Sequence, residues 1–298
     1  MAVTLKPLDQ QVIVLTGASS GIGLATARAA AKKGAKLVLT GRSERTLGEI
    51  ARRITDAGGE AIAVAADVAD RAAVERVAAA AIDRFGRIDT WINNAGVSIY
   101  GRLDAVSEED SRRLFDTNFW GVVNGSLAAL PHLLKQGGAL INIGSEVSDA
   151  VVPLQGMYSA SKHAVKGFTD ALRVELEDMD QAPIVITLIQ PTAVDTPFPQ
   201  HARNYMPREP KLPTPQIDPE DVAEAILETA VDPTRSRKVG VMAKVNTAMA
   251  KAVPGLADRI AARQADRQQY DEPPRDPAGT LYTAGESGRM HGTGGKEE

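Results

Sequence analysis

The chain has 298 residues, which is enough for one large α/β domain or two small ones. Its net charge of −4 offers no basic field for nucleic acid, and the absence of cysteine excludes disulfides and thiolate catalysis. The four histidines lack ligand-like spacing, and no apolar run approaches the ~20 residues that span a bilayer. We therefore expect no nucleic-acid partner, no metal site, no transmembrane segment and a cytoplasmic protein.

Short apolar runs alternate with segments of helical spacing along the first 190 residues. This alternation predicts βαβ units, and the continuous apolar character of the runs is typical of strands buried on both sheet faces. The predicted fold class is α/β, a doubly wound parallel sheet of Rossmann type in a single domain. We expect strands at 12–16, 36–40, 61–66, 88–93, 139–143 and 184–189, and helices at 22–33, 43–57, up to about 85, 108–134 and 158–178.

The sequence changes character after the sixth predicted strand. Seven prolines between 197 and 219 predict an irregular substrate loop at 193–218, followed by a helix at 219–230 and a last strand at 238–242. We assign 1–245 to the dinucleotide-binding and catalytic domain and 246–272 to a helical extension. Residues 242–267 carry an apolar stripe that favours a packed helix over a membrane-surface helix. The Gly-, Pro- and charge-rich segment 273–298 is expected to be a flexible tail, dispensable for cofactor binding.

A glycine-rich turn joins the first predicted strand to the first predicted helix. Gly17, Gly21 and Gly23 form the pattern G-x-x-x-G-x-G. Such glycines permit a tight turn and close approach of a phosphate to the helix N-terminus, where unpaired N–H groups and the helix dipole favour an anion. A glycine turn can also be purely structural, but the position between strand and helix favours phosphate binding.

Tyr158 and Lys162 lie four residues apart and share one face of a predicted helix. A free tyrosine has a pKa of ~10, which is too high for a base at neutral pH, and a nearby ammonium lowers it. The alternative is that the two side chains simply lie on a half-exposed helix surface and take no part in catalysis.

Further motifs follow the glycine loop in a fixed order: Asn93-Asn94-Ala95-Gly96, then Asn118, Ser145 and the Tyr158/Lys162 pair. With these motifs, residues 10–245 resemble the short-chain dehydrogenase/reductase family. The resemblance implies hydride transfer between NADP(H) and an alcohol or carbonyl substrate. It also implies a homo-oligomer, a tetramer or dimer, paired through the helices at 108–134 and 158–178.

The resemblance implies four catalytic roles. Tyr158 gives or takes the hydroxyl proton, while Lys162 lowers the pKa of Tyr158 and holds the nicotinamide ribose. Ser145 hydrogen-bonds the substrate oxygen, and Asn118 anchors a water that links Lys162 to solvent. The alternatives are that Ser145 caps a turn and that Asn118 is a buried amide bonded to backbone.

The resemblance also implies a set of cofactor-binding residues. Asp67 follows the third strand, where the family often contacts adenine, although it could equally be a helix cap or turn residue. The family usually has Pro-Gly after the sixth strand, and Thr192 after Pro191 departs from that pattern. The expected cofactor contacts are Gly17, Ser19, Ser20, Gly21, Ile22, Gly23, Gly41, Arg42, Ser43, Asp67, Val68, Asn94, Ala95, Gly96, Tyr158, Lys162, Pro191, Val194 and Thr196.

The end of the second strand indicates a preference for NADP(H) over NAD(H). NAD-selective proteins place an acidic residue there for the ribose hydroxyls, whereas this chain has Gly41 and Arg42. Glycine makes room for a 2′-phosphate and a guanidinium pairs with it, while Ser43 adds a hydroxyl. Arg42 could instead be a solvated surface charge. Because Ser19 and Ser20 supply no second basic residue, we expect a moderate preference.

The expected substrate pocket is formed by segments 97–101, 146–157 and 193–215. Its apolar residues suggest a hydrophobic or aromatic alcohol or ketone, although they could simply pack the loop or a subunit interface. The alternative function is a non-catalytic NADP(H)-binding sensor or scaffold, which need not keep all four catalytic residues. Epimerases and dehydratases of this fold carry a different glycine loop and a larger C-terminal domain. This chain has neither feature, which argues against those activities.

Overall fold

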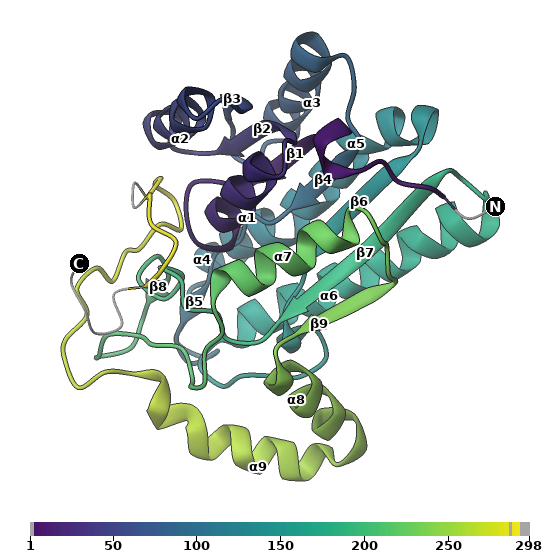
Figure 1. The fold of residues 1–298 in the computed structure, drawn as a ribbon. Coiled ribbons are helices and arrows are strands. Elements are labelled where there is room, and N and C mark those ends of the chain that lie inside the picture. Colours follow the sequence, from purple (N-terminus) through teal and green to yellow (C-terminus); the bar gives the residue numbers. More distant parts are fainter. Residues whose placement is uncertain (1–2, 286–287, 293–298) are drawn as a thin grey trace.

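Within residues 3–285 and 288–292, which the computed structural model describes, seven parallel strands form one central sheet (Figure 1). All six strands expected in the first 190 residues form close to their expected positions. In spatial order the strands are β3 (Glu60–Ala65), β2 (Lys36–Gly41), β1 (Val12–Thr16), β4 (Thr90–Asn93), β6 (Gly138–Ile143), β7 (Ile184–Pro191) and β9 (Ser236–Val239).

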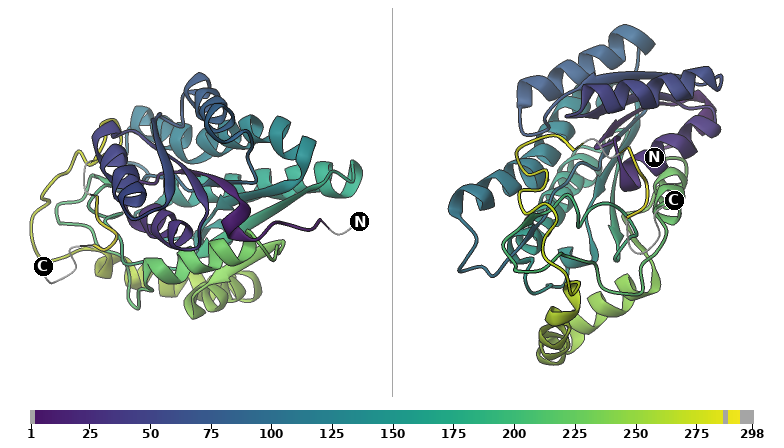
Figure 2. Two further views of the ribbon diagram at one scale, coloured as in Figure 1. Left: turned by 45° about the horizontal axis from the view of Figure 1, so that its top comes forward. Right: turned by 90° about the vertical axis from the view of Figure 1, so that its left-hand side faces the viewer.

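Helices cover both faces of this sheet, so the chain is a single-domain, doubly wound α/β fold of Rossmann type (Figure 2). One face packs against α1 (Gly21–Lys32), α2 (Glu44–Asp56) and α7 (Pro219–Thr229). The other packs against α3 (Arg71–Phe85), α5 (Gly121–Gln136) and α6 (Gly156–Arg173), with α4 (Glu108–Phe115) preceding α5.

The strand β1 shows why the apolar runs are continuous. Ile13 and Leu15 belong to the core cluster on the α1 face, while Val14 belongs to the cluster on the α3 face. Successive strand residues point to opposite faces, so a strand buried on both sides needs apolar residues at every position. All three side chains are fully buried.

The order of the strands places a crevice at the carboxyl end of β1. The chain moves outward from β1 to β2 and β3, then returns to β4 on the other side of β1. Open α/β sheets bind ligands at such a switch point, because the two sets of connecting loops diverge there. The glycine loop after β1 and the Asn94–Gly96 turn after β4 lie at this point.

Three elements differ from expectation. The last strand, expected at 238–242, is Ser236–Val239, because Gly240 (φ +89°) ends it and a helix begins at Val241. The helix expected at 108–134 is interrupted by a π-helical turn, Asp116–Trp120. The proline-rich loop contains one short strand, β8 (Arg203–Asn204), which pairs with an unexpected β5 (Ile99–Tyr100).

The C-terminal extension is a pair of helices, α8 (Val241–Ala252) and α9 (Pro254–Gln264), which starts five residues before the expected boundary at 246. Parts of the tail that was expected to be flexible contact the body: Leu281 is fully buried, and the Thr280 N–H donates to the His201 carbonyl. Among the described residues, no helix is both long and apolar enough to cross a membrane.

Candidate active site

The glycine loop has a backbone that requires glycine. Gly17 and Gly21 have φ angles of +67° and +51°, which favour glycine. A Cβ added at Gly23 would lie 2.0 Å from the Gly17 carbonyl oxygen, so strand and helix could not approach as they do. Asn94 braces the loop from the end of β4, since its Nδ2 donates to the carbonyls of Thr16 (3.0 Å) and Gly17 (3.2 Å).

The N-terminus of α1 faces this loop. Ser20 occupies the N-cap position but makes no side-chain capping bond within the described part of the chain. The first N–H groups of a helix have no partner inside the helix, so they are suited to an anion. The loop therefore fits a cofactor pyrophosphate.

The turn after β2 carries Gly41, Arg42 and Ser43. Ser43 caps α2, because its Oγ accepts from the Thr46 N–H at 3.3 Å. Arg42 is not a solvated surface charge: its guanidinium donates to the carbonyls of Thr280 (2.5 Å) and Leu281 (3.3 Å), and burial lowers its pKa. This excludes the surface alternative.

Asp67, at the end of β3, is held in two ways. Its Oδ1 accepts from the Ala69 N–H at 3.0 Å, which is the turn role considered from the sequence. Its Oδ2 pairs with Arg113 Nη2 at 2.5 Å, and Arg113 also donates to the Leu281 carbonyl. Arg113, on α4, brings a second guanidinium close to Arg42, which sequence spacing could not reveal.

Tyr158 and Lys162 lie in the first two turns of α6. Lys162 Nζ lies 5.8 Å from the Tyr158 ring centroid and donates to the Ile143 carbonyl at 2.8 Å. Ser145, at the end of β6, lines the same cavity as Tyr158 and acts to lower the pKa of that tyrosine. The pair therefore faces the carboxyl edge of the sheet and is not an exposed helix surface.

Burial dominates the ionisation of this pair. Burial raises the pKa of Tyr158 to about 12, although Ser145 acts in the opposite direction. Burial also lowers the pKa of Lys162 to about 8. Burial thus acts against the lowering of the tyrosine pKa that was expected from the ammonium, and Tyr158 carries its proton at neutral pH.

Ser145 and Glu146 form a 3₁₀ turn after β6. Ser145 caps this turn by accepting from the Val147 N–H. Glu146 Oε2 accepts from the hydroxyl of Thr192 (3.0 Å) and the amide of Asn246 (3.1 Å), and burial raises its pKa. The unusual Thr192 after Pro191 therefore ties β7 to the catalytic turn, and Asn246 does the same for α8.

Asn118 lies in the π-helical turn and is fully buried. Its amide exchanges two hydrogen bonds with the backbone of Val97 (2.8 and 2.9 Å) and donates to Ser161. These contacts match the alternative considered from the sequence, in which Asn118 is a buried amide bonded to backbone. A Cβ on Gly96 would lie 3.5 Å from Asn118 Oδ1 and 3.8 Å from Lys162 Nζ, so Gly96 lies between the two.

Most of the predicted site residues line one cavity of about 240 Å³. All nineteen expected cofactor contacts line this cavity. Of the four proposed catalytic residues, Tyr158, Lys162 and Ser145 line it, whereas Asn118 does not. Glu146, Leu212 and Pro213, from the expected substrate segments, also line it, and so do residues outside those segments: Thr117, Thr280, Ala284 and Gly285. The glycine cradle, the α1 N-terminus and Arg42 fit a dinucleotide along this cavity.

A second cavity of about 260 Å³ adjoins the first and shares Glu146, Val147, Val152 and Thr192 with it. Its remaining wall is largely apolar and comes from 150–153, the proline-rich loop and the two C-terminal helices. Met242, Met249, Ala257 and Ile260 belong to this wall.

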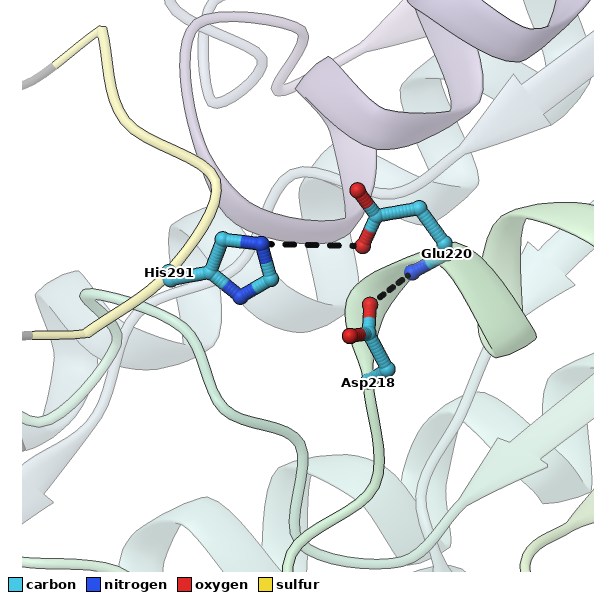
Figure 3. Close-up of side chains that lie close together, drawn as sticks. All are labelled: Asp218, Glu220 and His291. Atoms are coloured by element: carbon cyan, nitrogen blue, oxygen red, sulfur yellow. Dashed lines mark hydrogen bonds and ion pairs between the residues drawn. The ribbon is translucent and has the colours of Figure 1, made fainter.

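One group of potential metal ligands lies elsewhere, among the residues that the structure describes (Figure 3). The ligand atoms of Asp218, Glu220 and His291 lie within 4.8 Å of one another, and all three side chains are exposed. Asp218 caps α7 by accepting from the Glu220 N–H at 2.9 Å, so this carboxylate has a structural role.

Comparison with known proteins agrees with this geometry. The family model described as short chain dehydrogenase matches residues 11–206. The uncharacterized oxidoreductase YxnA of Bacillus subtilis is 46% identical over 286 residues, which cover 94% of this chain and 80% of YxnA. The fold and the site thus define an NAD(P)-dependent oxidoreductase acting on CH–OH groups. The chain belongs to the short-chain dehydrogenase family.

Two solved structures are similar to the whole fold. An alcohol dehydrogenase from the archaeon Thermococcus sibiricus, complexed with 5-hydroxy-NADP, is 30% identical with a TM-score of 0.67 over 77% of this chain and 94% of that one. A short-chain dehydrogenase/reductase from Burkholderia phymatum, in complex with NAD, is 28% identical with a TM-score of 0.73 over 92% of this chain and 99% of that one.

Proposed function

We propose that the protein interconverts an alcohol and a ketone or aldehyde with NADP(H), using Tyr158, Lys162, Ser145 and Asn118. The observation that carries this proposal is that Tyr158, Lys162 and Ser145 line the same cavity as the glycine loop. The Tyr158 hydroxyl, as proton donor, and the Ser145 hydroxyl are thus both available to one substrate oxygen in this cavity.

The residues have separate tasks in carbonyl reduction. When bound, the nicotinamide supplies the hydride to the carbonyl carbon. Ser145 donates a hydrogen bond to the substrate oxygen as negative charge grows there, and Tyr158 transfers its proton to that oxygen. Lys162 stabilises the resulting phenolate, and Asn118 holds the backbone of Val97 and, through an anchored water, links Lys162 to solvent.

The preference for NADP(H) is supported by two guanidinium groups. Arg42 follows the open Gly41 position and lines the cavity, while Arg113 pairs with Asp67, which also lines it. Their combined charge exceeds that of Asp67, which favours a 2′-phosphate. The two similar structures above contain one cofactor of each type, so this chain's own residues carry the proposal.

The substrate is proposed to be hydrophobic, because the second cavity extends the catalytic turn with a mainly apolar wall. The competing proposal is a non-catalytic sensor that binds the same cofactor. It predicts cofactor binding without turnover of any carbonyl compound. We also propose a cytoplasmic homo-oligomer, paired through α4, α5 and α6.

The test combines a carbonyl panel with Tyr158→Phe. Purified protein and NADPH are mixed with aliphatic, aromatic and polycyclic ketones and aldehydes, and loss of NADPH absorbance is followed. We expect Tyr158→Phe to lower kcat by about 10²–10⁴-fold while the NADPH Kd stays unchanged, because only the proton donor is removed.

Tyr270→Phe is the matched control, since Tyr270 lies outside the catalytic cavity. It should keep wild-type turnover. A Tyr158→Phe variant that retains more than about a tenth of kcat would contradict the assignment of Tyr158. Binding of NADPH with no turnover of any compound would favour the sensor.

A further inference from the structure

The C-terminal strap, which we define as residues 276–285 and 288–292, lies across the mouth of the proposed cofactor cavity. Thr280, Ala284 and Gly285 line the same cavity as the glycine loop. In Figure 2 (right), the yellow segment crosses the face of the molecule that is turned toward the viewer. The strap is therefore part of the cavity wall.

A buried leucine anchors the middle of the strap. Leu281 is fully buried in a cluster with Val97, Ile99 and Leu114, against which Tyr158 also packs. The neighbouring Tyr282 hydroxyl donates to Asp110 at 2.8 Å. This packing holds the strap against α4 and the catalytic wall.

Close backbone contact holds the strap to the proline-rich loop. The Thr280 N–H donates to the His201 carbonyl at 2.8 Å. Gly279 has φ +55°, and a Cβ there would lie 2.5 Å from the Ala202 carbonyl oxygen. Only glycine allows this approach without a shift of the backbone.

The strap bonds to two groups that we assign to phosphate recognition. Arg42 donates to the carbonyls of Thr280 and Leu281, and the Gly21 N–H donates to the Arg289 carbonyl at 2.9 Å. Arginine has five N–H donors, so two bonds to the strap leave others for a phosphate. The carbonyls thus fix the direction of Arg42 without using all of its donors.

The end of the strap lies against two carboxylates. His291 lies 3.6 Å from Asp195 and 3.7 Å from Glu220, and the second pair is drawn in Figure 3. The Gly292 N–H also donates to Asp195, at 3.2 Å. The strap is therefore fixed on both sides of the cavity mouth, at α4 and at the start of α7.

We propose that the C-terminal strap is the outer wall of the adenosine side of the cofactor site, where it orients Arg42 and closes over the bound dinucleotide to slow its release. The Gly21 N–H has one proton to donate and donates it to the Arg289 carbonyl, so this one bond must open when a pyrophosphate binds, whereas Arg42 keeps free donors while the strap stays seated. The inference rests on the proposed function, since it needs a dinucleotide in this cavity.

The test uses Gly279→Ala and Leu281→Asp in the full chain, which displace the strap without changing a residue of the glycine loop. Gly255→Ala is the matched control, because a Cβ there has no described atom within 4 Å. NADPH release is measured by stopped-flow fluorescence, and trypsin cleavage at Arg289 reports whether the strap is seated. We expect release at least about tenfold faster in both strap variants, as for loss of one to two hydrogen bonds to the site, and a wild-type rate in the control.

The outcomes separate this inference from the proposed function. Wild-type release rates in variants whose Arg289 is newly cleaved would overturn the strap proposal alone. Tighter NADPH binding in those variants would overturn it in favour of a strap that competes with the cofactor. A wild-type chain that binds neither NADPH nor NADH would instead contradict the proposed function. A purely structural role would lower Tm without changing the release rate.

Discussion

Tyr158, Lys162 and Glu146 share one wall of the catalytic cavity, and burial acts on each in the direction that removes its charge. The result is a protonated tyrosine beside a lysine that titrates near neutral pH. This arrangement suits carbonyl reduction, in which the tyrosine must begin with its proton. Oxidation of the alcohol needs the phenolate and should be favoured at higher pH.

The lowered pKa of Lys162 predicts a pH dependence. Below about pH 8 the ammonium is charged and can stabilise the phenolate that forms during reduction; above it the charge is lost. We expect kcat/KM for NADPH, which reports ionisations of the free enzyme, to fall as pH rises through about 8. Lys162→Met should give a low and flat profile over the same range. A wild-type profile that stays level to pH 10 would contradict this role for Lys162.

At the scale of elements, the sequence allowed accurate prediction where one residue type decides the structure. The strand β1 was predicted to the residue, because its apolar run ends at a glycine that must turn. The π-helical turn at Asp116–Trp120 and the pairing of β5 with β8 depend on tertiary contacts, so their sequences carried no signal.

The site shows the same division between local and distant information. The residues lining the cavity were predictable from ordered motifs, whereas Arg113 and Glu146 were missed because distant segments define their roles. The strap was missed for another reason. It binds through backbone carbonyls and a single leucine, and these leave no compositional pattern in a segment rich in glycine, proline and charge.

The end of β2 carries the prediction on cofactor choice. A Cβ at Gly41 would meet its nearest described atoms at 3.8 Å, so Gly41→Asp fits without strain. Its carboxylate would accept from the ribose hydroxyls and repel a 2′-phosphate. We expect Gly41→Asp/Arg42→Ala to shift the ratio of kcat/KM values toward NADH by about ten- to a hundredfold, which corresponds to about 1.5–3 kcal/mol for a charged hydrogen bond.

Two further variants separate the contributions to this shift. Gly41→Asp alone keeps the bonds of Arg42 to the strap, whereas Arg53→Ala changes an exposed arginine on α2, the helix that follows this turn, and should have no effect. Equal efficiencies with NADPH and NADH in the wild type, or no shift in the double variant, would contradict the proposed preference.

At the scale of the whole molecule, the long helices leave an apolar stripe uncovered. Trp120, Leu127 and Leu134 lie seven residues apart and are 52%, 38% and 36% exposed. Beside them, α6 exposes the small residues Gly167 and Ala171. Small residues allow two helices to approach closely, so these faces are suited to pairing with a second copy. Ala129, on α5, is fully buried in the core and cannot contribute to this surface, whereas Ala171 is exposed.

We therefore expect sedimentation to show a dimer or tetramer at micromolar concentration. Trp120→Glu/Leu127→Glu should shift the population to a single chain of 31.6 kDa, because a buried charge without a partner opposes association. Leu256→Glu, at a similarly exposed leucine on α9, is the control and should keep the wild-type assembly. A wild-type protein that sediments only as the single chain would contradict this prediction.

The two adjoining cavities have a consequence for how the cofactor takes part in turnover. The second cavity is lined by α8, α9 and the proline-rich loop, and by none of the described strap residues. On the strap proposal, the carbonyl substrate and the dinucleotide would therefore enter and leave by separate openings of the molecule. A variant that displaces the strap should then change the release of the dinucleotide while the KM for the carbonyl substrate stays at its wild-type value.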